Sequence, residues 1–235
     1  MQNLSTYKQQ FILKIGDGKL ASIRSALDIA ADELSDAELL LKLAYKLWET
    51  PDLWQVRFAA ETLLGRMAHL FPEALDFLRN FCSRDPVWFV QEGLAYAVGE
   101  FCNGIGFKEC IPLLKDWVQD AHQNVRRAVS EGIRIKPYWK NPCAAVRNEP
   151  DLIISILEPL RTDPALFVIK SVGNNLSDIS LYYPEKAFDT VKTWLEETGY
   201  HKATHKIARR AFRKLIKTRK AEVLAVLRME QYRNI

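Results

Sequence analysis

Carboxylate side chains set among aromatic and basic ones are the residues of this chain best suited to chemistry. Trp88 and Glu92 lie four residues apart, so on a helix the indole ring and the carboxylate share one face. Arg127 takes the place of Glu92 thirty-five residues later, and Glu131 follows it by about one helical turn. A cleft of this kind would attract a phosphate backbone through its basic rim, while its carboxylates would stabilise a cation.

Lys170 and Asp178 are expected to point toward the same cleft from a later segment. The charges also allow a purely structural interpretation, in which Glu131 pairs with Arg127 and orders the stack of helices. In that interpretation Glu92 pairs with Arg126 or Arg127. Both interpretations are open on the sequence alone.

The helices that must position these residues are arranged in repeats. Five stretches of the chain can be superposed, and each contains a branched residue that serves as an anchor. The anchors are Val56, Val90, Val125, Val168 and Ile207, which are 34, 35, 43 and 39 residues apart. This is the period of paired-helix repeats, which bury their apolar face only by stacking. We therefore predict an all-α fold, a right-handed α-α superhelix (solenoid) with a concave basic face.

Two positions of each repeat are expected to line that face. The position two after the anchor reads Phe58, Glu92, Arg127, Lys170 and Arg209. The position six after the anchor reads Thr62, Tyr96, Glu131, Asn174 and Arg213. Residues four apart share a helical face, so stacking would align the two columns into one mostly basic surface.

We expect a single domain over residues 1–235. Residues 1–36 would cap the repeats at one end and residues 218–235 at the other, with about five helix pairs over residues 37–217. Apolar periodicity and turn residues predict the helices of these pairs. Their ranges are 37–48, 53–63, 72–82, 88–101, 107–119, 124–135, 151–160, 165–180, 185–198 and 202–217.

Two further features of the repeats carry expectations. The small residues Gly93, Ala128 and Ser171 should be buried where neighbouring helices approach closely. Residues 136–150 interrupt the pattern as a loop in which segment 137–142 carries two prolines, and Trp139 in this loop either packs or contacts a ligand.

Composition argues against several classes of protein. A hydrophobic content of 48% and a charged content of 26% are those of an ordinary soluble protein. No 18-residue apolar run and no signal peptide is seen, so neither membrane insertion nor secretion is expected. The four cysteines form no CxxC or Cys/His cluster, and we expect buried thiols in a reducing cytoplasm and no metal site. No glycine-rich phosphate-binding motif is complete, so no nucleotide cofactor is expected.

Positive charge is concentrated toward the C-terminal end. Residues 201–235 contain eleven lysines and arginines against two glutamates, a net charge of +9, and the remainder carries −5. A basic end on a mildly acidic body is typical of a polyanion-binding protein. The alternative is a solvated cap on the last repeat.

At these residues the sequence resembles the HEAT-like repeat DNA alkylation-repair proteins of the AlkC and AlkD type, the bacterial alkylpurine DNA glycosylases. The resemblance runs from about residue 47 to 217 and rests on segments 47–49, 124–134, 170–178 and 183–184. The AlkD pattern of a tryptophan and, four residues later, a catalytic aspartate falls on Trp88 and Glu92. Its phosphate-contacting arginine falls on Arg127, and its second active-site tryptophan on Asn174. The arginine, glutamate and aspartate of the AlkC pattern fall on Arg127, Glu131 and Asp178.

The resemblance implies a DNA glycosylase that excises cationic alkylated bases such as 3-methyladenine or 7-methylguanine. The candidate catalytic residues are then Glu92, Trp88, Asp178 and Glu131. The candidate DNA contacts are Arg127, Arg126, Lys170, Arg134, Arg209, Arg210, Arg213, Lys217 and Trp139. The implied partner is damaged or distorted double-stranded DNA, bound by a monomer in the bacterial cytoplasm or nucleoid.

Two alternatives stay open. The first is a non-catalytic protein that recognises distorted or branched DNA by its backbone and shape. The second is a protein-binding solenoid, because concave helical-repeat surfaces also hold peptides. The basic C-terminal segment argues against the second alternative unless the partner is acidic.

Overall fold

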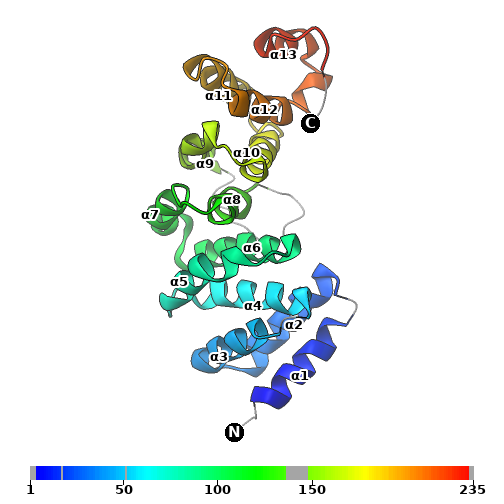
Figure 1. Cartoon of the computed structure of the whole chain (residues 1–235), viewed down its shortest axis with the longest axis vertical. Helices are drawn as coiled ribbons and strands as arrows, with labels where there is room; N and C mark the ends of the chain where they lie inside the picture. Colours follow the sequence, from blue (N-terminus) through cyan, green and yellow to red (C-terminus); the bar gives the residue numbers. More distant parts are fainter. Residues whose placement is uncertain (1–3, 17, 51, 136–147, 233–235) are drawn as a thin grey trace. The chain divides into compact units, whose positions relative to one another are not determined.

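The computed structural model describes residues 4–16, 18–50, 52–135 and 148–232. Over these residues it contains thirteen α-helices, three short 3-10 helices and no strand (Figure 1). The predicted all-α class is confirmed. The chain divides into two compact units, Met1–Ile105 and Gly106–Ile235, here called unit 1 and unit 2.

Unit 1 is built from six α-helices and one 3-10 helix. They are α1 (Leu4–Ile15), α2 (Leu20–Glu33), α3 (Ala37–Trp48), α4 (Trp54–Met67), α5 (Glu73–Asn80), η1 (Cys82–Arg84) and α6 (Trp88–Ile105). The start of α3 is fixed by Asp36, whose carboxylate accepts hydrogen bonds from the backbone N–H groups of Glu38 and Leu39. The central helix is α4, which packs against both α3 and α6 (Figure 1).

Unit 2 is built, over its described residues, from seven α-helices and two 3-10 helices. They are α7 (Phe107–Trp117), α8 (Gln123–Gly132), α9 (Pro150–Leu157), η3 (Glu158–Thr162), α10 (Leu166–Ile179), α11 (Pro184–Glu197), α12 (Lys202–Ala211), η4 (Leu215–Lys217) and α13 (Lys220–Leu227). Here α10 is central and packs against α8 and α12 (Figure 1).

The predicted helix 202–217 is shorter in the structure. Helix α12 ends at Ala211, and a turn leads into η4. This turn places Arg213 and Lys214 against Ser177 and Asp178 of α10. These polar contacts compensate for the helical hydrogen bonds that are lost by ending α12 early.

Helices α4 and α6 of unit 1 and helices α8, α10 and α12 of unit 2 are here called the inner helices, and the other α-helices the outer helices. Within each unit, neighbouring inner helices approach closely at small residues. Gly93, Ala128 and Ser171 are buried, as the repeats predict. A Cβ atom added at Gly93 of α6 would touch the Glu61 carboxylate and lie 3.0 Å from the Phe58 Cα atom, both in α4. Gly173 of α10 is equally restricted, because a Cβ there would lie 2.7 Å from the Cβ of Arg210. The close approach of backbones therefore fixes which helix faces meet.

The carboxyl group beside Gly93 has a raised pKa. Glu61 is fully buried in α4. Burial, and then the negative charge of Asp85, raise the pKa of Glu61 well above its ordinary value, and the guanidinium group of Arg57 offsets only part of this. The helix contact therefore disfavours a charged Glu61.

A repeated arginine–aspartate pair, here called the inter-repeat pair, connects successive inner helices. In unit 1, Arg57 of α4 binds Asp85, which precedes α6, with Nε to Oδ2 at 2.7 Å. In unit 2, Arg126 of α8 binds Asp163, which precedes α10, at 2.6 Å. Each aspartate also accepts a hydrogen bond from the backbone N–H group two residues later in the chain, which is that of Val87 for Asp85 and that of Ala165 for Asp163. Each pair therefore fixes where the next inner helix begins.

Other expectations from composition can be compared with the structure. Cys82, Cys102 and Cys110 are buried thiols, as expected, and Cys143 lies outside the described residues. Among the described helices, none is both long enough and apolar enough to cross a membrane.

The close helix contacts predict the effect of larger side chains. Gly93→Leu and Ala128→Leu should each lower the free energy of unfolding by about 1 to 3 kcal/mol, because the added side chain overpacks the contact. Urea unfolding measures this. Ala21→Leu and Ala221→Leu, at exposed helical positions, serve as controls with no expected loss. If Gly93→Leu unfolds like Ala21→Leu, α4 and α6 do not pack in the proposed register.

Candidate functional site

The first turn of α6 presents the predicted aromatic and acidic pair. Trp88 is the first residue of α6 and is 56% exposed. Glu92 follows one turn later on the same face and is partly exposed. An exposed indole can bind a cation through its π face, and a nearby carboxylate can stabilise developing positive charge.

The ring of Trp88 belongs to a stack of three aromatic side chains. It lies on Phe89 with ring centroids 3.7 Å apart and planes at 27°. Phe89 lies in turn on Trp54, the first residue of α4, at 4.4 Å and 20°. The sequence analysis did not single out Trp54 or Phe89. A signal for Phe89 exists in the repeated segment Asp-Pro-x-x-Phe, which occurs at residues 85–89 and 163–167.

Two of the predicted DNA contacts in unit 2 are engaged within the protein. The guanidinium group of Arg126 binds Asp163 and also donates to the backbone carbonyls of Asp120 and Ala121, at 2.8 and 2.9 Å. Arg127 is buried, with its guanidinium carbon 4.1 Å from the centre of the Phe167 ring. Arg126 therefore forms an ion pair between repeats, but with Asp163, a partner that the sequence did not indicate.

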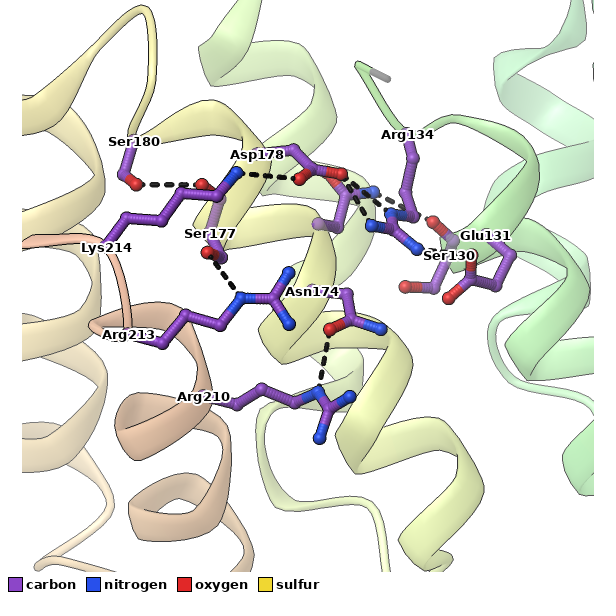
Figure 2. A network of polar contacts seen from close by, with 11 residues as sticks. Ser130, Glu131, Arg134, Asn174, Ser177, Asp178, Ser180, Arg210, Arg213 and Lys214 are labelled. Carbon is purple, nitrogen blue, oxygen red and sulfur yellow. Dashed lines mark hydrogen bonds and ion pairs between the residues drawn. The ribbon is translucent and has the colours of Figure 1, made fainter. Parts of the chain in front are cut away.

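The structure brings five of the predicted residues of unit 2 together in what we call the α8–α10–α12 polar cluster (Figure 2). These five are Glu131, Arg134, Asp178, Arg210 and Arg213, and Asn174, Ser177 and Lys214 complete the cluster. Arg134 is central: its Nη2 lies 2.6 Å from Oδ2 of Asp178, and its Nη1 lies 2.8 Å from Oε2 of Glu131. The other oxygen of Asp178 accepts a hydrogen bond from Lys214 at 3.1 Å. Both oxygens of Asp178 are thus bound to cationic groups, and this carboxylate is only 4% exposed.

Two further arginines extend the cluster toward solvent. Arg210 donates to the Asn174 side-chain oxygen at 2.7 Å, and Arg213 donates to the Ser177 hydroxyl at 3.1 Å (Figure 2). Both arginines are partly exposed. Lys214 and Ser177 were not among the predicted site residues.

The cluster holds more positive than negative charge. Its cations are Arg134, Arg210, Arg213 and Lys214, and its carboxylates are Glu131 and Asp178. Burial, and then the positive charges of Arg213 and Arg134, lower the pKa of Arg210. An anion such as a phosphate group would relieve this repulsion.

The inner part of the cluster is electrostatically compensated. Burial lowers the pKa of Arg134, but the carboxylates of Glu131 and Asp178 raise it by more, so the pKa of Arg134 is raised overall. Arg134 therefore stays charged and neutralises both acids. The excess positive charge belongs to the half-exposed residues of the outer part.

The remaining predicted DNA contacts differ in exposure. Lys170 of α10 and Lys217 of η4 are exposed, and Arg209 of α12 is partly exposed. Trp139 lies outside the described residues. No group of histidine, cysteine, aspartate and glutamate side chains in the described segments is arranged to hold a metal ion.

Comparison with known proteins identifies the family. Residues 20–216 match the family described as DNA alkylation repair enzyme. The structure is similar to that of AlkD2 from Streptococcus mutans, with 30% identity and a TM-score of 0.74 over 90% of this chain and 99% of that one. The structure of smu.31 from Streptococcus mutans UA159 is similar as well, with 30% identity and a TM-score of 0.71 over the same shares. These similarities confirm the HEAT-like helical-repeat fold.

Two further proteins are similar to this chain at a lower sequence identity. The alkylpurine DNA glycosylase AlkC of Pseudomonas fluorescens, solved with DNA containing an abasic site analog, shares the fold at 23% identity and a TM-score of 0.53, over 95% of this chain and 65% of that one. The uncharacterized protein YhaZ of Bacillus subtilis (strain 168) is 28% identical over 208 residues, 84% of this chain. The chain spans 57% of the length of YhaZ.

The polar cluster predicts a structural role for Asp178. Asp178→Asn removes the charge that binds Arg134 and Lys214, and breaking a buried ion pair of this kind costs about 3 to 5 kcal/mol of stability. Asp151→Asn breaks the exposed pair with Lys186 and should cost less than about 1 kcal/mol. Urea unfolding of both variants measures the difference. Equal stability of the two variants would contradict the structural role and would make Asp178 a stronger catalytic candidate.

Proposed function

The chain belongs to the family of DNA alkylation repair enzymes, and we propose that it binds duplex DNA and excises cationic alkylated purines from it. The substrates would be bases such as 3-methyladenine and 7-methylguanine in damaged or distorted duplex, and the enzyme would act as a monomer in the bacterial cytoplasm. The observation that carries this proposal is the pairing of an exposed Trp88 ring with the partly exposed Glu92 one turn later on α6.

DNA binding is supported by the excess positive charge of unit 2. Arg210 and Arg213 at the outer part of the polar cluster, with Lys170 on α10, offer partly or fully exposed cations to a phosphate backbone. Arginine suits this task because its planar group binds phosphate oxygens in a bidentate manner. In the AlkC structure from Pseudomonas fluorescens, a protein of the same fold is bound to DNA.

Excision of an alkylated purine makes a modest chemical demand. The base already carries a positive charge, so the bond from the sugar to the base breaks with its electron pair passing to the base. The enzyme must stabilise the positive charge that develops on the sugar. Water then adds to the anomeric carbon and loses a proton. We assign the stabilising charge to Glu92 and a supporting π face to Trp88.

Glu92 suits this role better than the other carboxylates. Asp178 is bound by Arg134 and Lys214, and Glu131 is bound by Arg134, so their charges are compensated within the buried cluster. Glu131 and Asp178 are both buried, whereas Glu92 is partly exposed near the start of α6, where a substrate can approach it.

A second candidate function is non-catalytic recognition of distorted or branched DNA. It is favoured by Asn174, which occupies the position of a second tryptophan in the AlkD pattern and binds Arg210. In this function the same cations bind the DNA backbone, and no base is released. Measuring base release separates the two functions.

The proposed phosphate contacts predict the salt dependence of DNA binding. Neutralising one contact should reduce the slope of log affinity against log salt by about 0.9 for B-form DNA. We expect this for Lys170→Gln and Arg210→Gln, measured by fluorescence anisotropy with an undamaged duplex. Lys186→Gln on the outer helix α11 is the matched control and should keep the parent slope. If Lys170→Gln and Arg210→Gln also keep the parent slope, α10 and α12 do not contact the DNA backbone.

The catalytic assignment predicts the effect of removing one charge. Glu92→Gln keeps the size of the side chain but should slow base release on the order of 100-fold or more. DNA affinity should stay the same or rise, because a negative charge has left a polyanion-binding surface. The measurement is single-turnover release of 3-methyladenine or 7-methylguanine from alkylated duplex DNA.

Glu131→Gln and Asp178→Asn are compared with Glu92→Gln under conditions where each protein is folded. No release by the parent protein would favour the non-catalytic function. Release that survives in Glu92→Gln but is lost in folded Asp178→Asn would move the catalytic role to the polar cluster.

A further inference from the structure

The three-ring stack in unit 1 is exposed where apolar side chains are normally buried. Trp88 is 56% and Phe89 39% exposed, and Trp54 is partly exposed. The same unit buries other aromatic side chains, for example Phe58, which meets Tyr96 edge-on with planes at 61°. The exposed rings are instead nearly parallel, and Trp88, at one end of the stack, is the most exposed of the three. The core does not require this arrangement.

The geometry of the stack matches the stacking of bases. Neighbouring rings lie 3.7 and 4.4 Å apart with planes within 27° of parallel. Phe89 and Trp54 hold the Trp88 ring from behind, which reduces the conformational freedom that a ligand would otherwise have to remove. A fourth planar aromatic group could continue the stack on the open face of Trp88.

The surroundings of the stack favour a group that is attached to a phosphate. Trp54 opens α4 and Trp88 opens α6, and the positive ends of both helix dipoles therefore lie beside the rings. Leu53, at the N-cap of α4, supplies no side-chain hydrogen bond to the first turn. The amide donors of a first turn without a side-chain cap are well suited to a phosphate oxygen.

A second exposed aromatic group in unit 1 lacks these surroundings. Phe81 is 61% exposed and stacks on Phe77 at 5.1 Å. It follows the C-terminal end of α5, where the helix dipole is negative. This second group offers aromatic area without an anion site, so it provides a matched control.

We propose that the Trp54–Phe89–Trp88 stack is a platform for an unpaired nucleobase of bound DNA, which stacks on Trp88 with its phosphate near the start of α4. This rests on the proposed DNA binding and extends it from alkylated purines to unmodified bases that have lost their partner or neighbour. The platform gives the protein a preference for distorted over fully paired duplex. The preference does not depend on catalysis, because stacking requires only a π face.

The test compares two undamaged duplexes that differ by a single unpaired adenine in one strand. Base–aromatic stacking predicts that the parent protein binds the bulged duplex at least about fivefold more tightly than the paired one. Trp88→Leu should abolish this preference, because the variant loses the ring on which the unpaired base stacks. Trp88→Phe should keep part of the preference, and Phe89→Leu should reduce it because Phe89 supports the Trp88 ring.

Phe81→Leu is the matched control and should bind both duplexes like the parent. Equal binding of the two duplexes by the parent would overturn the platform and leave the proposed DNA binding intact. A preference that persists in Trp88→Leu, or disappears in Phe81→Leu, would overturn it as well. Failure of the parent to bind either duplex would contradict both the platform and the proposed function.

Discussion

The inter-repeat pair is the interaction on which the placement of the inner helices depends. Arg57 and Arg126 each extend from one inner helix to the aspartate that opens the next, over separations of 28 and 37 residues. Both partners of each pair are almost completely buried. Removing one member would leave an uncompensated charge in the interior, which is among the costliest changes a fold can suffer. The protein is therefore stable only when adjacent repeats are spaced so that the arginine reaches the aspartate.

The same pair determines what the inner helices present. Because Asp85 fixes the start of α6, Trp88 and Phe89 emerge in the first turn, beside Trp54 at the start of α4. Asp163 fixes α10 in the same way, and Phe167 then meets Arg127. Function and stability are divided between the residues of each repeat: buried charges position the helices, and side chains at their first turns and along α12 face solvent.

The sequence predicted local features well and long-range partners poorly. Helix 37–48 coincides with α3, and the buried small residues follow from the repeat itself. Trp88 and Glu92 share a face because the helix periodicity requires it. The partners of Arg126 and Asp178 within the fold could not be predicted from the sequence. They lie 37, 44 and 36 residues away, and only packing selects Asp163, Arg134 and Lys214 among many acceptors and donors. The early end of α12 likewise depends on the contacts of Arg213 and Lys214 with α10, which local helix propensity cannot predict.

The central claim, that DNA lies against the first turns of α4 and α6, is tested most directly by fluorine NMR of protein labelled with 5-fluorotryptophan. Single Trp→Phe variants assign the resonances. Titration with duplex DNA is expected to shift the signals of Trp54 and Trp88, while the buried Trp117 and Trp194 stay in place as internal controls. Saturating DNA that leaves the Trp54 and Trp88 signals unmoved would contradict the account.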